Sequence, residues 1–254
     1  MKERLRIDKL LAHAGCGTRS EIKRYVKAGM VTVDGITVKD SGLIVVPSEQ
    51  VIAFQGAQVH YRSVVYFMLN KPQGVISATE DARDTTVIDL LKPEDNLLKP
   101  FPVGRLDKDT VGLLLLTNDG AMAHELLSPR KHVVKTYEAK VRGKVTDEDI
   151  SAFSEGIELE DGYMTMPSEL QIVTRDHDDE GDLTYISLKI KEGKFHQVKR
   201  MFQAVGKTVL TLKRVTMGPL VLDESLAEGQ YRELSQEELH SLKVLQGGKL
   251  GKKS

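Results

Sequence analysis

The first part of the chain carries apolar residues at helical spacing. Within residues 4–29, Ile7, Leu10, Leu11 and Ala14 fall at i, i+3, i+4 and i+7, which puts them on one face of a helix. Glycines follow this stripe directly and predict its end, and the rest of the segment has the caps and spacing of a second short helix. The segment is therefore expected to form two short helices.

Two further patterns predict strands. Residues 31–38 alternate apolar and polar positions around Asp34-Gly35, a two-residue turn typical of a tight hairpin. Residues 111–117 are almost wholly apolar, and a run of this length is typical of a strand buried on both faces. A core strand is therefore expected in the middle of the chain.

Weaker signals complete the expected order of elements. They predict strands over 64–69, 133–141, 184–190 and 209–215, a turn over 70–74, and helices over 86–91, 121–127, 146–156, 196–205 and 234–245. Residues 79–85 are polar and are expected to form an exposed loop. The acidic segment 174–183 is expected to be a hairpin connection that points away from any polyanion.

Composition limits the class of protein. The chain has 254 residues, 40% of them apolar and 29% charged, as in an ordinary soluble globular protein. It has no run of about 18 apolar residues, so no membrane-spanning helix is expected. Residues 1–6 are charged and lack a hydrophobic signal region, which favours a cytoplasmic location. Cys16 is the single cysteine and has no histidine at zinc-ligand spacing, so neither a disulfide nor a metal is expected.

Charge is distributed unevenly along the chain. The net charge is −1, yet residues 1–29 carry eight Lys or Arg against three acids. The candidates for RNA contact in this segment are Arg4, Arg6, Lys9, Arg19, Lys23, Arg24 and Lys27. Arg19, Lys23 and Lys27 share one helix face, with Arg24 beside them, and such a row of cations suits the phosphates of an RNA strand. The alternative interpretation is an ordinary solvated helix face.

The segment before the apolar strand carries a candidate catalytic carboxylate. Residues 104–110 read Gly-Arg-Leu-Asp-Lys-Asp-Thr, a charged turn that runs directly into the strand. Asp107 is therefore expected at the edge of a core, where a rigid element can hold its carboxylate in one place. Asp107 and Asp109 have an ordinary alternative as turn or helix-cap acids, and Asp109 is expected to stay structural.

Four blocks of the sequence resemble the motifs of one enzyme family. Residues 69–75, 104–120, 135–139 and 192–202 are similar, in this order, to motifs of pseudouridine synthases of the RsuA branch, and residues 4–56 resemble the S4 RNA-binding domain. The resemblance implies an α+β fold with a mixed, mostly antiparallel sheet and flanking helices, preceded by a small S4-like domain. The expected division is an S4-like domain over 1–58, a linker over 59–63, a catalytic domain over 64–245 and a disordered basic tail over 246–254.

The same resemblance implies roles for individual residues. Asp107 would be the catalytic carboxylate, and Lys199 would hold the position of the basic residue opposite it, with Arg200 as the alternative. Tyr137 would stack on the target uracil, and Leu212 would pack beneath the base. Further substrate contacts are expected from Arg105, Arg200, Lys71, Lys194 and Arg214, of which Lys71, Lys194 and Arg214 are expected to bind phosphate. His196 is expected only to satisfy a local hydrogen bond.

The implied activity is site-specific isomerisation of uridine to pseudouridine in ribosomal RNA. Residues 196–201, His-Gln-Val-Lys-Arg-Met, look most like the members that modify small-subunit (16S) RNA, and large-subunit or transfer-RNA members are the near alternative. The reaction oxidises nothing and adds no group from outside, so no cofactor is expected. The expected partner is ribosomal RNA, free or within an assembling ribosomal subunit, with no membrane partner, and the chain is expected to act as a monomer.

Two rival functions differ in class. A non-catalytic RNA-binding assembly factor would bind RNA without isomerising it, and it would not need Asp107. A glycosidase would need a second acid at a set distance from the first, and Asp109 and Asp119 are the nearby candidates.

Overall fold

The computed structural model describes residues 3–59 and 61–247. Contacts between Cα atoms divide the chain into two compact units, which are described separately: Met1–Val65 together with Lys92–Lys99, and Tyr66–Leu91 together with Pro100–Ser254. The domain boundaries expected from the sequence stay predictions. Of the expected disordered tail, Gln246 and Gly247 belong to the last helix, and residues 248–254 lie outside the described residues.

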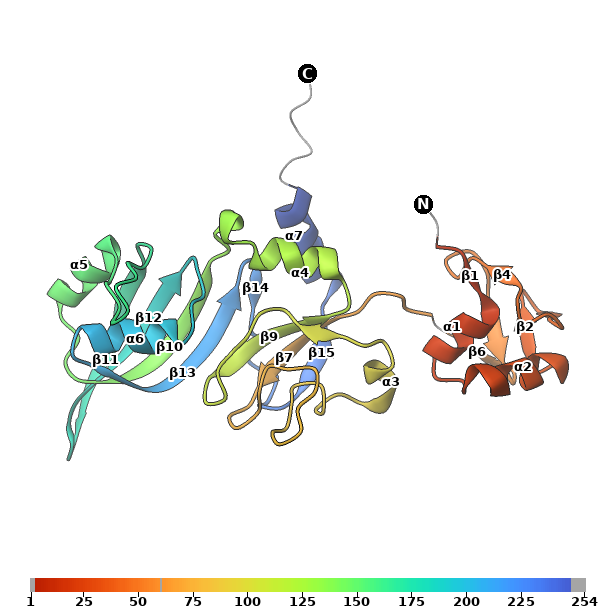
Figure 1. The fold of residues 1–254 in the computed structure, drawn as a ribbon, viewed down its shortest axis with the longest axis horizontal. Coiled ribbons are helices and arrows are strands. Elements are labelled where there is room, and N and C mark those ends of the chain that lie inside the picture. The colour runs from red at the N-terminus through yellow and green to blue at the C-terminus, as the bar shows by residue number, and fades with distance from the viewer. Residues whose placement is uncertain (1–2, 60, 248–254) are drawn as a thin grey trace, which may run out of the picture. The chain divides into compact units, whose positions relative to one another are not determined.

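The N-terminal unit packs short helices against short strands (Figure 1). Its elements are β1 (Leu5–Arg6), α1 (Ile7–His13), α2 (Arg19–Lys27), β2 (Val31–Val33), β3 (Ile36–Thr37), β4 (Ile44–Val45), β5 (Ile52–Phe54), β6 (Ala57–Gln58) and, from the segment that joins it later in the chain, α3 (Pro93–Asn96). The strands form a four-stranded antiparallel sheet in the order β3-β2-β5-β6, and β1 pairs separately with β4.

Local sequence signals explain this unit. Thr18 and Glu21 form a capping box that begins α2, in which the Thr18 hydroxyl accepts from the Glu21 amide and the Glu21 carboxylate accepts from the Thr18 amide. Asp34 and Gly35 both have positive φ, 51° and 78°, as a tight hairpin turn requires. The two predicted helices and the hairpin are confirmed.

The C-terminal unit is built on one large sheet. Its strands run in the order β11 (Glu169–Asp178), β12 (Gly181–Ile190), β10 (Lys135–Arg142), β13 (Thr208–Met217), β9 (Val111–Thr117), β7 (Tyr66–Lys71) and β15 (Tyr231–Glu233), with β14 (Leu220–Val221) on β13 and β8 (Phe101–Pro102) on β9. The β9–β13 pair is parallel and every other pair in this sheet is antiparallel. The predicted α+β class with a mixed, mostly antiparallel sheet is confirmed.

Helices cover both ends of this sheet (Figure 1). They are α4 (Gly120–Leu127), the 3-10 turn η1 (Pro129–Lys131), α5 (Asp147–Glu155), α6 (Gln197–Ala204) and α7 (Gln236–Gly247). Residues of α4 and α7 share one apolar cluster with Leu113 and Leu115 of β9, while Leu114 and Leu116, on its other face, are equally buried. At the other end Phe153 of α5 contacts Phe202 of α6, with ring centroids 5.0 Å apart. The predicted two-sided burial of the 111–117 strand is confirmed.

Two local predictions were wrong, and a third was only partly right. Residues 86–91 do not form a helix, because Thr86 and Asp89 bond each other's backbone amides in a single turn, and α3 begins only at Pro93. The turn expected over 70–74 begins later, since β7 continues to Lys71. The acidic segment 174–183 does contain the expected hairpin connection, but most of it is strand, because β11 and β12 extend to a turn at its tip.

A glycine permits the parallel contact between β9 and β13. Gly112 has φ +100°, and a Cβ at this position would lie 2.3 Å from the backbone oxygen of Arg214. The two strands can pair here only because that atom is missing.

Replacing Gly112 with alanine is expected to lower the free energy of unfolding of the C-terminal unit by about 2–4 kcal/mol, because backbone must move away from backbone. Gly162→Ala is the matched control: its φ is +78° but no atom lies within 4 Å of the added Cβ, so a loss of about 1 kcal/mol is expected. Urea unfolding of both variants measures the difference, and equal losses would contradict the close-approach explanation.

Candidate active site

The loop that carries Asp107 is fixed by bonds to its backbone. The Ser77 hydroxyl accepts from the Leu106 amide at 3.0 Å and donates to the Leu106 carbonyl at 2.9 Å. The Gly74 amide donates to the Lys108 carbonyl at 2.8 Å. Because β9 begins directly after the loop, the loop is held by a strand at its end and by these hydrogen bonds to Ser77 and Gly74 along its length. A side chain on this loop is therefore held in one direction.

Lys71 completes this support from beneath the loop. Its side chain is fully buried, and its ammonium group donates to the carbonyl oxygens of Pro72 (3.0 Å), Thr110 (2.8 Å) and Lys108 (3.4 Å). Burial lowers the pKa of Lys71 to about 8, although Asp109 and Asp107 oppose this shift. The prediction that Lys71 binds phosphate was wrong, because its charge has no access to solvent and is already surrounded by acceptors.

The Asp107 carboxylate is partly buried and faces two basic side chains. Lys199 Nζ donates to Asp107 Oδ2 at 3.2 Å and also bonds the Asp109 carboxylate. His196 Nε2 lies 3.6 Å from Asp107 Oδ1. The hydrogen bond from Lys199 lowers the pKa of Asp109. Lys199 therefore fixes the direction of the Asp107 carboxylate from the side opposite the loop.

Helix α6 decides between the two basic candidates. His196 has φ 48° and ends the preceding loop, so that the helix begins at Gln197. Lys199 then faces Asp107, whereas Arg200 pairs with Asp161 (2.6 Å) and lies 3.4 Å from Glu160. The structure brings Lys199 to Asp107 and takes Arg200 elsewhere, in keeping with the roughly 100° that separates consecutive residues on a helix.

Asp107 opens onto a small cavity of about 70 Å³. Tyr137, which is 7% exposed, and Leu212, which is 5% exposed, line it from neighbouring strands β10 and β13. Arg105 and Lys194 are exposed at its rim. Five of the predicted site residues therefore line one cavity: Asp107, Tyr137, Leu212, Arg105 and Lys194. Lys199 bonds the Asp107 carboxylate.

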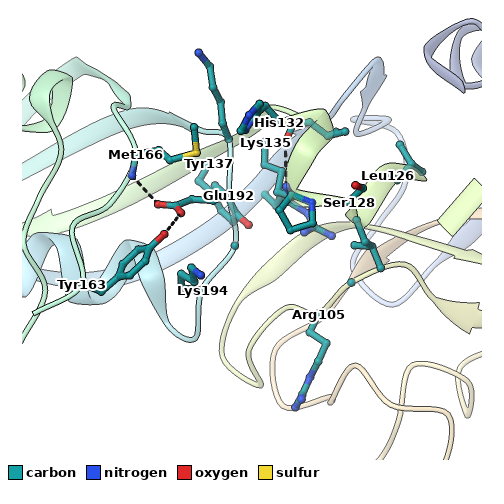
Figure 2. A pocket seen from close by; sticks show the side chains of 17 residues that line it. Arg105, Leu126, Ser128, His132, Lys135, Tyr137, Tyr163, Met166, Glu192 and Lys194 are labelled. Carbon is teal, nitrogen blue, oxygen red and sulfur yellow. Dashed lines mark hydrogen bonds between the residues drawn. The ribbon is translucent and has the colours of Figure 1, made fainter. Parts of the chain in front are cut away.

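A larger cavity of about 310 Å³ adjoins the first and shares Arg105, Tyr137, Gly193 and Lys194 with it (Figure 2). Glu192 bonds the Tyr163 hydroxyl (2.7 Å), the Met166 amide (2.9 Å) and the Gln197 side chain (2.8 Å), so it ties the wall together.

Arg214, which was expected to bind phosphate, lines the larger cavity as well. It is 2% exposed and its Nε donates to the Leu113 carbonyl. It therefore belongs to the interior of this site, and its expected role as a phosphate ligand stays a prediction.

The N-terminal unit presents its predicted basic residues unevenly. Arg19, Lys23, Arg24 and Lys27 are all exposed on α2, and Arg4 and Lys9 are exposed near α1. Arg6 is different, because its guanidinium binds the carboxylate of Asp8 with two hydrogen bonds of 3.0 and 2.9 Å. This pairing lowers the pKa of Asp8 and makes Arg6 less available to an RNA phosphate.

Two site residues were missed or misjudged from the sequence. His196 was expected to act only locally, yet it lies beside Asp107 and stacks on Phe195 with ring centroids 3.8 Å apart. Lys135 was not singled out, yet it lines the larger cavity. A signal existed for Lys135, because it stands two residues before Tyr137 on the same strand and so shares its face of the sheet.

Two kinds of feature are absent from the part of the chain that the structure describes. In the ranges 3–59 and 61–247, no group of three or more His, Cys, Asp or Glu side chains could hold a metal ion. Within the same ranges, no helix has the length and apolar character needed to cross a bilayer.

Several known proteins are similar to this chain. Residues 65–204 match the RNA pseudouridylate synthase family, and residues 5–51 match the S4 domain. The uncharacterized RNA pseudouridine synthase YtzG of Bacillus subtilis (strain 168) is 53% identical over 94% of this chain and 98% of its own length. Ribosomal small subunit pseudouridine synthase A of Escherichia coli (strain K12) is 39% identical over 94% and 100%. A crystal structure of a pseudouridylate synthase matches with 38% identity and a TM-score of 0.64, covering 94% of this chain and 99% of that one.

The chain therefore belongs to the RNA pseudouridylate synthase family and carries an S4 domain. It is a pseudouridine synthase, as the four sequence blocks predicted.

Lys71→Met is expected to lower the free energy of unfolding of the C-terminal unit by about 2–4 kcal/mol, because three backbone carbonyl oxygens, that of Thr110 in a buried bond, lose their donor. Lys108→Met is the control from the same loop. Lys108 is exposed and pairs with the exposed Asp84, so its loss should change stability by less than about 0.5 kcal/mol. Urea unfolding tests both, and a stability of Lys71→Met equal to wild type would refute the supporting role.

Lys135, which is partly buried, and Lys71, which is fully buried, also predict how the free energy of unfolding changes with pH. Burial and the nearby Arg214 lower the pKa of Lys135 from 10.5 to about 8. The unfolded chain therefore binds more protons between about pH 8 and pH 10.5, so this lysine makes the free energy of unfolding rise with pH in that window. Lys71 contributes in the same direction. Lys135→Met should be more stable than wild type at pH 7 and should show a smaller rise up to pH 10. An unchanged rise, measured by urea unfolding at several pH values, would contradict the lowered pKa.

Proposed function

We propose that this enzyme isomerises a specific uridine of small-subunit (16S) ribosomal RNA, with Asp107 as the catalytic carboxylate. The observation that carries the chemistry is the Asp107 side chain itself, held by a rigid loop and by Lys199 at a cavity lined by Tyr137 and Leu212. The substrate assignment is supported by relatives that are named ribosomal small subunit pseudouridine synthase A and match 94% of this chain.

The reaction breaks the bond from ribose C1′ to uracil N1 and joins C1′ to C5 of the same ring. N1 gains a proton, C5 loses one, and no other reactant is consumed. The Asp107 carboxylate has three open routes: attack on C1′, addition to C6, or removal of the C2′ proton. All three need one carboxylate near the junction of sugar and base, and the fixed direction of Asp107 supplies it.

The cavity walls fit a base that has left its stack. We infer that the Tyr137 ring stacks on the uracil and that Leu212 packs beneath it, since both side chains line the small cavity that Asp107 faces. Stacking on an aromatic ring contributes about 1–3 kcal/mol, and extruding a base costs a few kcal/mol. Arg105 and Lys194, exposed at the rim, are proposed to contact the displaced strand and offset the rest of that cost.

The N-terminal unit is proposed to bind the same RNA through the exposed face of α2. Its cations stand at intervals of one helical turn and can each contact a phosphate. The RNA is proposed to be a ribosomal RNA, free or within an assembling subunit. A monomeric enzyme and a cytoplasmic location stay predictions.

Mapping of pseudouridines tests the proposed reaction and substrate together. In cells that lack the gene, one pseudouridine of small-subunit ribosomal RNA is expected to be missing, and wild-type protein should restore it. Asp107→Asn should reduce the rate by about 10³-fold or more, because it removes the reacting carboxylate, while RNA affinity stays within a few fold. Asp109→Asn, the neighbouring control, should retain measurable activity.

Restoration of the modification by Asp107→Asn would contradict the catalytic assignment. A site that is missing only from large-subunit or transfer RNA would contradict the substrate assignment and leave the reaction intact.

The α2 face makes a separate prediction. Replacing Arg19, Lys23 and Lys27 together with glutamine removes three exposed charges from the full-length chain. The slope of log affinity against log salt for a small-subunit RNA transcript should then fall by about two to three units. Filter binding between about 50 and 200 mM salt measures it. The same substitutions at Lys140, Lys144 and Lys189 provide the control, and equal slopes for both triple variants would argue against an RNA-binding α2.

A further inference from the structure

The larger cavity beside Tyr137 has a strong excess of positive charge. Its lining includes Arg105, Lys135, Lys191, Lys194 and Arg214, and Glu192 is the one acid in that lining (Figure 2). The cavity is distinct from the small one that Asp107 faces, and Tyr137 and Gly193 line both. Nothing in the isomerisation step itself requires a second cavity or this charge.

Arg214 is the most deeply buried cation that lines this cavity, and one of its donors is unused. The side chain is 2% exposed, and its Nε is used by the Leu113 carbonyl. Its terminal Nη2 is buried, and among the described residues it has no hydrogen-bond partner. A buried charged donor without a partner is unfavourable, so this nitrogen is expected to meet an acceptor that enters the cavity.

Lys135 stands next to this unpaired donor. Its ammonium group donates one hydrogen bond, to the Val133 carbonyl at 3.0 Å (Figure 2). Arg214 pairs across the sheet with Tyr137, which stands two residues from Lys135 on β10, and both cations line the same cavity. Besides burial, the Arg214 charge lowers the pKa of Lys135, as expected for two cations in one partly buried place. An ammonium group has three donors, and an anion between Lys135 and Arg214 would satisfy both side chains.

Glu192 does not fill this role. One of its carboxylate oxygens accepts from the Met166 amide and the Gln197 side chain, and the other accepts from the Tyr163 hydroxyl. It stays on the wall to which these groups fix it (Figure 2). The Glu192 charge does act on Lys135, because it opposes the lowering of the pKa of that lysine. Among the residues that the structure describes, however, no carboxylate forms an ion pair with Lys135 or Arg214.

We propose that this cavity is an anion subsite in which Lys135 and Arg214 bind an RNA phosphodiester next to the target uridine. The inference rests on the proposed function, since one RNA strand would cross both cavities. A phosphodiester fits because its oxygens accept from the two cations, while its ribose meets apolar surface of Leu126, Leu127 and Val133 on the same wall. The subsite thereby holds the strand one nucleotide away from Asp107, so that the extruded uridine is positioned at the Asp107 carboxylate.

The first arm of the test measures the anion without any reaction. Nuclear magnetic resonance titrations compare the dinucleotide uridylyl-uridine, its uncharged methylphosphonate analogue and inorganic phosphate. Wild type should bind the dinucleotide about tenfold more tightly than the analogue, because the analogue lacks the charged oxygen. In Lys135→Met the two should bind equally, and Lys135→Arg should restore the difference. Equal binding by wild type would overturn the subsite, and equal affinity for inorganic phosphate would reassign it to free phosphate.

The second arm uses small-subunit RNA transcript. Lys135→Met should weaken binding about tenfold and lower the salt slope by about one unit. Lys140→Met, on the same strand but outside the cavity lining, should behave as wild type. Urea unfolding confirms that both variants fold. If Lys135→Met and Lys140→Met have the same slope, the subsite is wrong even if the enzyme isomerises uridine. If wild type does not isomerise uridine at all, the dinucleotide arm still decides whether the cavity binds phosphodiester.

Discussion

One buried ammonium group, that of Lys71, holds the loop that carries Asp107. Lys71 lies under the Asp107 loop and donates to three backbone carbonyls, two of them in that loop. Burying a charge costs several kcal/mol unless its donors are satisfied, and these carbonyls satisfy all three. The same bonds hold the loop in place, and the Asp107 carboxylate therefore keeps a fixed direction. Lys199 then orients that carboxylate from the open side.

The sheet brings distant parts of the chain to this loop. Strand β9 follows it directly and pairs with β13 in parallel, which is possible because Gly112 lets the backbone of Arg214 approach. Strand β13 also pairs with β10, so Tyr137, Leu212 and Arg214 reach the same region from two strands. The two cavities are consequences of this arrangement. Asp107 lines the small cavity, and Lys135 and Arg214 line the larger one.

Much of this could be predicted from local patterns, and the failures have physical causes. The apolar run 111–117, the Asp34-Gly35 turn and the carboxylate at Asp107 each carry a signal within a few residues. The burial of Lys71 carries none, because a lysine after an apolar strand reads equally well as exposed, and only the tertiary fold places three carbonyls around it. The choice of Lys199 over Arg200 depended on where α6 begins, which His196 sets with a left-handed backbone. The helix predicted over residues 86–91 was wrong because a Thr and an Asp three residues apart can close a single turn as well as cap a helix.

The most direct measurement is a crystal structure of the enzyme with an RNA that carries 5-fluorouridine at the modified position. We expect the fluorinated base outside its stack, between Tyr137 and Leu212, with its C1′ or C6 in contact with the Asp107 carboxylate. A base that remains stacked in the RNA, or one held in the protein with Asp107 turned away from it, would contradict the central role of this carboxylate.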